Sequence, residues 1–209
     1  MTASLSARLR EGTKDSHRSA EHSPFIRKFF TGQLTRKVYA EFLLQLYFVY
    51  TALEQIQENH KGHATLGKIA FPELYRIAAI EEDLNFYFGN TDWKEIKPRQ
   101  ATQVYVQRIN ELSEQWVEGL VAHLYTRYLG DLSGGQALKK VVARSFDLAT
   151  NEGIAFYEFS EITDIPRFKN EYRAQLDAMP LDDASAEKIV EEANRAFDLN
   201  RGVFDAMDE

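Results

Sequence analysis

Cysteine is absent from this chain of 209 residues. Its absence excludes disulfide bonds, thiolate metal sites, iron–sulfur clusters and a cysteine nucleophile. Any metal must therefore be held by nitrogen or oxygen ligands.

Long hydrophobic runs and an excess of positive charge are also missing. The longest apolar stretch, residues 42–53, contains Gln45 and is well short of the ~20 residues that span a bilayer. Arg8 and Arg10 stand where a signal peptide would have its apolar core. A net charge of -7 argues against nucleic acid as the main partner, because such binding rests on neutralising phosphates. We therefore expect a protein without membrane attachment, in the cytoplasm or the plastid stroma.

The residues that are present have the composition of a globular protein, with 44% hydrophobic and 27% charged residues. Apolar residues recur every three or four positions, and no sustained alternation is flanked by hairpin turns. The pattern predicts an all-α fold in a single domain over residues 1–209. The expected helices cover residues 4–20, 23–32, 35–59, 72–88, 102–113, 116–148, 168–178 and 183–207.

Residues 125–136, here called the glycine segment, interrupt this periodicity with three glycines. Each costs up to ~1 kcal/mol of helix stability relative to alanine, so a compensating purpose is expected. Spacing alone leaves two interpretations open. Gly134 and Gly135 end one helix and start another, or Gly130 and Gly134 share a bare helix face against which something flat and large can lie.

Two nucleotide-binding motifs in this segment are misleading. Residues 132–136 spell LSGGQ, the signature string of ABC transporter ATPases, which also need a GxxxxGK[ST] loop after a strand. Gly130 and Gly135 have the spacing of that loop, but Gln136 and Ala137 replace its Lys and Ser/Thr. The sequence therefore argues against nucleotide hydrolysis.

The histidines are the candidate nitrogen ligands for a metal. None of the five has a glutamate three residues before it, which excludes a ferritin-like di-iron bundle. His60 and His63 are expected to be solvated at a helix end, and the apolar neighbours of His123 indicate a core histidine, although it competes as a ligand. His17 has Glu21 one turn later, where a carboxylate could hold the imidazole of a metal ligand. A purely structural role for His17 stays open on these grounds.

At this point the chain resembles the heme oxygenase family, specifically its soluble, biliverdin-forming members from cyanobacteria, algae and their phages. The most specific stretch is LVAHLYTRYLGDLSGGQ at residues 120–136, which resembles the family's distal-helix signature. Further matches are LREGTKDSHRSAEH around His17, LYFVYTALE ending at Glu54, FPEL at 71–74 and FKNEYR at 168–173. The resemblance covers nearly the whole chain. It implies a single-domain helical fold with heme sandwiched between a proximal and a glycine-rich distal helix.

This resemblance assigns roles on both faces of the heme. It implies that His17 is the proximal iron ligand and Glu21 its hydrogen-bond partner. Asp131 would hold a water network that reaches the iron-bound oxygen, helped by Tyr50 and Arg127. A proton relayed through water would keep the oxygen–oxygen bond intact long enough to attack the porphyrin ring, whereas a directly coordinated acid or base favours its cleavage.

The resemblance also assigns residues to the heme edge and pocket. The two anionic propionates require cations at the pocket mouth. The cations would be Arg10, Lys14, Lys169 and Arg173, with Tyr125 as a hydroxyl partner. The remaining pocket residues would be Gly130, Ser133, Gly134, Gly135, Phe197 and Asn200. Arg10 stands where some relatives are expected to have lysine, and it keeps the charge.

The implied reaction uses O2 to convert heme b, both substrate and cofactor, into biliverdin IXα, ferrous iron and carbon monoxide. Because no G-x-G-x-x-G turn marks a flavin or nicotinamide site, electrons must come from a partner. We expect reduced ferredoxin, docking on Lys139, Lys140, Arg144 and the first helix. We further expect a monomer that supplies bilin synthesis, with a bilin reductase downstream. The alternatives are a non-catalytic heme carrier, against which Asp131 speaks, and a structural helical domain, which would leave the glycines unexplained.

Overall fold

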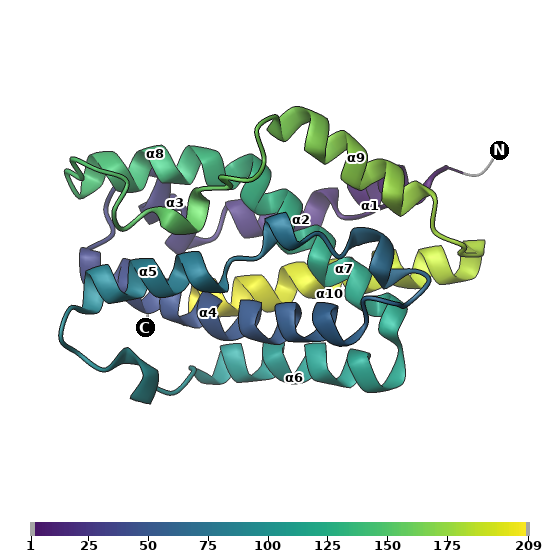
Figure 1. Ribbon diagram of the computed structural model, residues 1–209, viewed down its shortest axis with the longest axis horizontal. Coiled ribbons are helices and arrows are strands. Elements are labelled where there is room, and N and C mark those ends of the chain that lie inside the picture. Colours follow the sequence, from purple (N-terminus) through teal and green to yellow (C-terminus); the bar gives the residue numbers. More distant parts are fainter. Residues whose placement is uncertain (1–2, 208–209) are drawn as a thin grey trace.

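The computed structural model describes residues 3–207, which form helices and no strand. The predicted all-α class is therefore confirmed for the described residues. Figure 1 shows the helices running along the long axis of the molecule, with α6 along one side and α8 and α9 along the other.

The α-helices are α1 Leu5–Gly12, α2 Lys14–Glu21, α3 Pro24–Phe30, α4 Arg36–Asn59, α5 Ile77–Phe88, α6 Gln100–Gln115, α7 Leu120–Leu124, α8 Gln136–Ser145, α9 Ile165–Asp177 and α10 Asp183–Asp205. Short 3-10 helices are η1 Leu66–Ile69, η2 Pro72–Leu74, η3 Trp93–Glu95, η4 Val117–Gly119 and η7 Ala155–Tyr157. Two π-helical turns are η5 Tyr125–Leu129 and η6 Asp131–Gly135.

Two predicted helix starts are confirmed by their caps. The Ser23 side chain accepts a hydrogen bond from the backbone N–H of Ile26, with Pro24 in the first turn. Thr35 likewise accepts from the backbone N–H of Val38 at 3.2 Å. Each cap satisfies a backbone donor that the first helical turn leaves without a partner, and so fixes where the helix begins.

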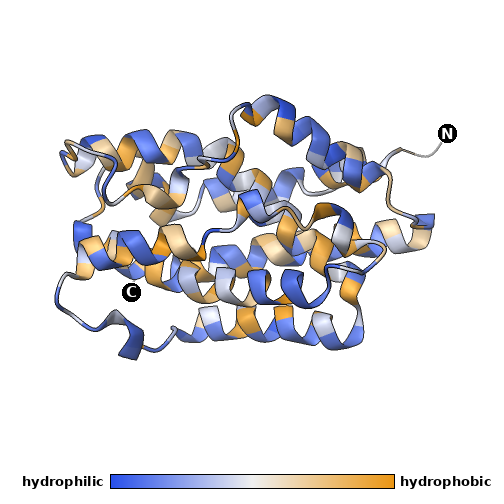
Figure 2. Ribbon diagram, in the orientation of Figure 1, coloured by the Kyte–Doolittle hydropathy of each residue, from blue (hydrophilic) through white to orange (hydrophobic). Residues whose placement is uncertain are grey.

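The two long helices α4 and α10 form the centre of the molecule. The first packs against α5 and α6, and α10 packs against α1, α2, α6 and α7. Phe25 of α3 joins them, because its ring lies 5.0 Å from that of Phe42 in α4 and 6.0 Å from that of Phe204 in α10. Figure 2 shows apolar and polar residues alternating around the helices, as expected when each buries one face.

The predicted first helix, residues 4–20, is wrong in its continuity, because Thr13 interrupts it between α1 and α2. Asn194 of α10 stabilises the break. Its amide donates to the carbonyl of Gly12 at 3.0 Å, and its oxygen accepts from the hydroxyl of Ser16 at 2.6 Å. A Cβ at Gly12 would lie 2.5 Å from Val190, so glycine allows α1 to approach α10 closely.

The predicted long helix 116–148 is also corrected. Its α-helical hydrogen bonding is interrupted by η5 and η6, and α8 ends at Ser145. The chain does not end a helix at Gly134 and Gly135, because Gly135 keeps right-handed helical angles and leads directly into α8. One of the two interpretations left open by the glycine spacing is thereby removed.

Smaller differences have local causes. The predicted helix 72–88 is split, because a 3-10 turn at Pro72–Leu74 precedes α5. The predicted helix 168–178 begins earlier, at Ile165, where the Asp164 side chain accepts from the backbone N–H of Arg167. The predicted helix 102–113 is longer at both ends, from Gln100 to Gln115. None of the helices over residues 3–207 has the length and apolar character to cross a membrane.

Candidate functional site

The glycine segment contains the most unusual backbone of the fold. The π-helical turns η5 and η6 lie on either side of Gly130, and such wide turns are rare and often mark functional sites. Gly130 and Gly134 do not have positive φ. A Cβ added at either would meet nothing within 4 Å. These two exposed glycines therefore leave room for something outside the protein, rather than supplying a backbone conformation that other residues avoid.

The opposite side of the segment is packed. A Cβ at Gly135 would lie 3.4 Å from the ring of Tyr157 and 3.7 Å from the Cβ of Asp131. Gln136, the next residue, donates from its side-chain amide to the carbonyl of Tyr157 at 3.0 Å. The segment thus has one bare face and one face supported by η7.

A buried polar network lies under the glycine segment. Asp131 accepts a short hydrogen bond from the hydroxyl of Tyr50 in α4. Arg127 donates to the other carboxylate oxygen of Asp131 at 3.2 Å and, from two of its nitrogens, to the Tyr50 oxygen at 3.1 Å. The structure therefore brings together the three residues predicted to act in catalysis.

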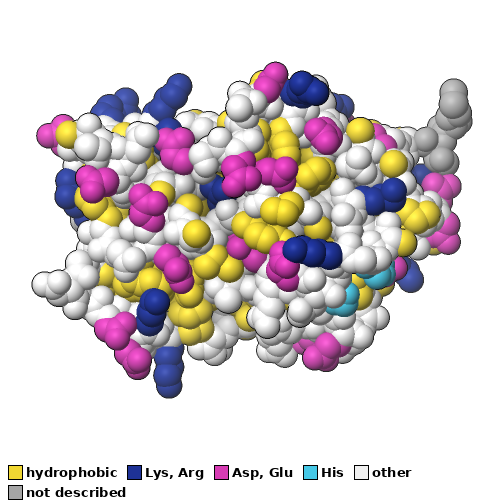
Figure 3. Space-filling model, in the orientation of Figure 1, with side chains coloured by type: hydrophobic (Ala, Val, Ile, Leu, Met, Phe, Trp, Pro, Cys, Tyr) yellow, Lys and Arg dark blue, Asp and Glu magenta, His cyan; other side chains and the backbone are white. Residues whose placement is uncertain are grey.

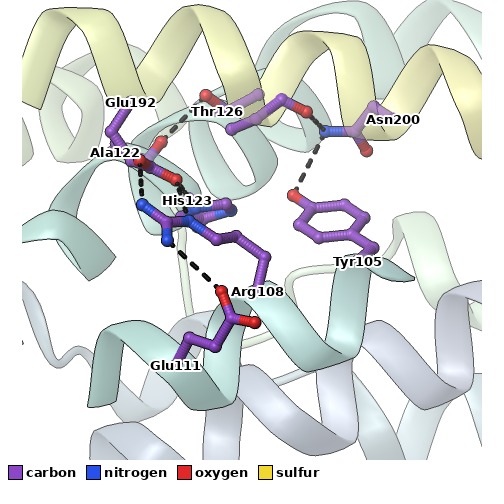
Figure 4. A network of polar contacts seen from close by, with 9 residues as sticks. Tyr105, Arg108, Glu111, Ala122, His123, Thr126, Glu192 and Asn200 are labelled. Carbon is purple, nitrogen blue, oxygen red and sulfur yellow. Dashed lines mark hydrogen bonds and ion pairs between the residues drawn. The ribbon is translucent and has the colours of Figure 1, made fainter. Parts of the chain in front are cut away.

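Two residues extend this network to other helices. Arg127 donates to the side-chain oxygen of Asn200 in α10 at 2.8 Å, and the Asn200 amide donates to the hydroxyl of Tyr105 in α6 at 3.2 Å. Figure 4 shows Asn200 and Tyr105 turned toward one another. Tyr105 is not among the predicted site residues, because its position on a regular apolar face gives no sign that its hydroxyl joins this network.

Burial controls the protonation of Asp131. Removal from water raises the pKa of this carboxyl above its ordinary value, although the Arg127 charge, the Tyr50 hydrogen bond and the charge of Arg76 oppose the rise. Burial likewise raises the pKa of Tyr50. The network therefore combines an acid that holds its proton more tightly than in water with hydroxyl and guanidinium donors.

His17 presents a half-exposed imidazole on α2. Its Nδ1 lies 3.5 Å from a carboxylate oxygen of Glu21, and the two side chains are 54% and 59% exposed. The imidazole ring also packs edge-on against Phe197 of α10 at 5.5 Å. One imidazole nitrogen thus has a carboxylate nearby, as in many metal-binding histidines, while the ring remains accessible.

Helix α10 connects His17 with the glycine segment. It packs against α2, α7 and η5. Phe197 contacts His17, and one turn later Asn200 contacts Arg127. The two parts of the candidate site therefore share one supporting helix.

Cationic side chains border the same region. Lys169 of α9 donates to the hydroxyl of Ser133 at 3.1 Å, which joins α9 to the glycine segment. Burial raises the pKa of the Tyr125 hydroxyl, and the charges of Arg173 and Arg10 and a hydrogen bond with Thr13 oppose the rise. Together with Lys14, these cations come from the first two helices, where Arg10 and Lys14 are exposed, and from α9, where Lys169 and Arg173 are half-buried.

The other histidines have structural partners. His123 is fully buried, and its Nε2 lies 3.0 Å from Glu192, which Arg108 also contacts (Figure 4). This arrangement agrees with the predicted core histidine. The expectation that His60 and His63 are solvated is wrong. Both are half-buried; His60 pairs with the Ser113 hydroxyl at 3.0 Å, and His63 accepts from the backbone of residues 65 and 66.

The predicted basic patch on α8 is smaller than its sequence indicates. Lys139 forms an ion pair with Glu158, whereas Lys140 and Arg144 are exposed. Figure 3 shows acidic and basic side chains intermixed over the face in view. Lys140 and Arg144 are therefore the clearer candidates for contact with an acidic partner.

These features define an all-helical protein with a site for a flat ligand. Nearby cations would pair with negative charge on that ligand, and a histidine nitrogen could coordinate a metal ion within it. A sequence model of the heme oxygenase family matches residues 3–206. The heme oxygenase of Guillardia theta is 44% identical over 209 residues, covering 100% of this chain and 88% of its own.

Solved structures give the same result. The crystal structure of heme oxygenase-1 from Synechocystis in complex with heme has a TM-score of 0.94 and 45% identity, and covers 98% of this chain and 92% of its own. The structure of heme oxygenase from Leptospira interrogans has a TM-score of 0.94 and 48% identity, and covers 98% and 100%. The chain belongs to the heme oxygenase family.

Proposed function

We propose that this protein cleaves heme oxidatively to biliverdin IXα, ferrous iron and carbon monoxide, using O2 and electrons from a separate donor. The observation that carries the proposal is the buried group of Asp131, Tyr50 and Arg127 within and beside a segment whose glycines leave one face bare. A heme carrier would need the bare face but not a buried acid next to it.

The residues present fit a heme. The open space beside Gly130 and Gly134, where a Cβ would meet nothing within 4 Å, would let a flat macrocycle lie against the backbone. The accessible imidazole of His17 would supply a nitrogen ligand to the iron, a common heme ligand and one available in a chain without cysteine. The cations Arg10, Lys14, Lys169 and Arg173, with Tyr125, would pair with the propionates.

The heme would supply the iron at which O2 is reduced and the porphyrin ring that is oxidised. The protein's own contribution is proton supply and positioning. Tyr50 and Arg127 orient the Asp131 carboxyl by donating to its two oxygens, and this carboxyl can take up and release a proton that water beside the glycine face would carry onward. Ser133, Phe197, Gly130 and Gly134 would hold the heme between the two faces, whereas Gly135, predicted to bind heme as well, is packed against Tyr157 on the opposite side.

The decisive experiment combines product analysis with one substitution. Purified protein with one equivalent of hemin, ferredoxin, its reductase and NADPH in air should yield biliverdin, identified by chromatography. Asp131→Ala should bind hemin as well as the unaltered protein and yield no biliverdin. If hemin binds but survives turnover with a competent donor, the carrier function replaces the enzymatic one.

We also propose that the donor is ferredoxin, an acidic protein, and that the basic side chains of α8 and the first helices receive it. Charge reversal at Lys139 and Lys140 should slow turnover more than it weakens heme binding. Because Lys139→Glu also disrupts the Glu158 ion pair, Lys140→Glu is the cleaner variant. Lys97→Glu, an exposed lysine just before α6, which runs along the other side of the molecule from α8 (Figure 1), is the matched control. Equal loss of turnover and heme binding would contradict this docking site.

A further inference from the structure

Helix α5 is joined to η7 by the side chain of Asp83, which is fully buried. One carboxylate oxygen accepts the backbone N–H of Ala155 at 2.8 Å, and the other accepts that of Phe156 at 2.8 Å. Each donor meets a different oxygen, so an amide in the same place would turn an NH2 group toward one of the two N–H groups. The first turn of η7 is therefore held by one side chain of another helix.

Arg76, at the start of α5, holds the other side of η7. Its guanidinium donates to the carbonyls of Phe156 and Glu158 and lies 3.9 Å over the ring of Phe159. It also donates to the carbonyl of Leu74 at 3.0 Å. Asp83 thus accepts from backbone N–H groups of η7, and Arg76 donates to backbone carbonyls in and just after it.

The 3-10 turn η7 packs against the side of the glycine segment opposite its bare face. Tyr157 packs against Gly135, and its carbonyl accepts from the side chain of Gln136 at 3.0 Å. Phe156 packs edge-on against Tyr50, with ring centroids 5.7 Å apart. Both the glycine segment and Tyr50, whose hydroxyl contacts Asp131, are therefore packed against η7.

We propose that Asp83 and Arg76 are positioning residues for the reaction: acting through η7, they set the place of the glycine segment and of Tyr50. A 3-10 turn of three residues has too few internal hydrogen bonds to hold its own position. The hydrogen bonds of Asp83 and Arg76, here called the α5 clamp, tie η7 to α5, which itself packs on α4. The positioning role rests on the proposed function, whereas the mechanical coupling does not.

Hydrogen exchange on the protein without heme tests the coupling. Asp83→Asn leaves one backbone donor of η7 without an acceptor, and should speed exchange at Ala155 or Phe156 by at least about tenfold. If the clamp positions the glycine segment, amides of residues 130–136 should also exchange several times faster. Exchange in α6 should be unchanged.

Gln136→Met provides a second, milder variant, because Gln136 is half-buried and touches η7 directly. It should loosen residues 130–136 while Ala155 and Phe156 stay protected. Gln45→Met is the matched control, since it removes a buried acceptor of Arg99 N–H and the Thr102 hydroxyl at the α4–α6 contact. This control should leave both η7 and the glycine segment unchanged.

Each outcome decides between coupling and a local role. Faster exchange at η7 in Asp83→Asn, with residues 130–136 unaffected, overturns the proposal. If Asp83→Asn loosens the whole molecule, Gln136→Met decides, and an unchanged glycine segment there also overturns it. Since no measurement uses heme, a failure here is distinct from a failure to form biliverdin.

Discussion

At the scale of one residue, Gly134 lowers the stability of the helical segment that carries the candidate site. Its Cβ position is open and its backbone is not left-handed, so neither packing nor conformation within the chain requires glycine. Alanine would be a better helix former. We infer that the position stays bare because a ligand approaches the backbone there.

The substitution Gly134→Ala tests this inference with two opposite effects. It should raise the free energy of unfolding of the heme-free protein by up to ~1 kcal/mol, because alanine favours the helix. It should weaken heme binding at the same time, since the added methyl group points into the open space. Denaturant unfolding and hemin titration measure the two effects. Gly62→Ala, also open to solvent but in the turn after α4, should leave heme binding unchanged.

Stability and binding moving together in Gly134→Ala would contradict this view. The sequence signalled an unusual segment here, because three glycines in a helical pattern violate a strong local preference, although it did not separate the bare Gly130 and Gly134 from the packed Gly135. Tyr105 and Arg76 gave no such signal. A tyrosine on an apolar face and an arginine before a helix are ordinary until tertiary contacts bring them near Asp131.

At the scale of the element, rotation of α10 decides which of two neighbouring glutamates is structural. Glu191 is exposed, whereas Glu192 is buried between α6 and α7. Burial by itself would raise the pKa of the Glu192 carboxyl. The hydrogen bonds from Arg108 and His123 outweigh this effect and lower the pKa to about 2. Periodicity places the helix, yet an error of one residue in its rotation would exchange the two side chains.

Glu192→Gln should destabilise the fold, because Arg108 and the buried His123 lose a charged partner. We expect a loss of about 2 kcal/mol at neutral pH, reduced from the cost of breaking a fully buried pair because Arg108 keeps some contact with water. Glu191→Gln should change stability by less than about 0.5 kcal/mol. Denaturant unfolding of both variants checks the prediction, and equal effects would mean that α10 is rotated otherwise.

The breaks in the predicted helices have an element-scale cause too. Local propensity supports residues 4–20 as a continuous helix, and in 116–148 only the three glycines weaken it. Contacts from α10 and η7 lie at the places where the chain departs from the predicted helices. Asn194 bonds to both sides of the break at Thr13, and η7 packs behind the π turns. Such contacts join residues far apart in the sequence, which a pattern along one helix does not contain.

At the scale of the whole molecule, buried carboxyls make stability depend on pH. Burial raises the pKa of Glu54 to about 7 and that of Asp83 to about 6, although backbone N–H groups and, for Glu54, the charge of Arg76 oppose the rise. The folded state therefore holds these protons more tightly than the unfolded chain. Their contribution to stability is fully present below about pH 4 and is lost as pH rises through 6 to 7.

We predict that the free energy of unfolding falls between pH 5 and pH 7, with each of these groups contributing on the order of 2 kcal/mol. Glu54→Gln should flatten the decline, because its amide does not titrate. Thermal or urea unfolding at several pH values measures the slope. A stability that rises over this interval, or a slope unchanged in Glu54→Gln, would refute the assignment.

The site is assembled from both halves of the chain. Ser16, one residue before His17, bonds to Asn194, and His17 itself packs on Phe197. During synthesis the ribosome releases His17 long before α10 exists, so the nascent chain carries an imidazole without the helix that supports it. Contacts between residues so far apart in the sequence carry a large loop-closure cost and cannot form before both partners are synthesised. Heme loading should therefore follow the synthesis of α10, because until then the imidazole of His17 lacks the Phe197 ring that supports it.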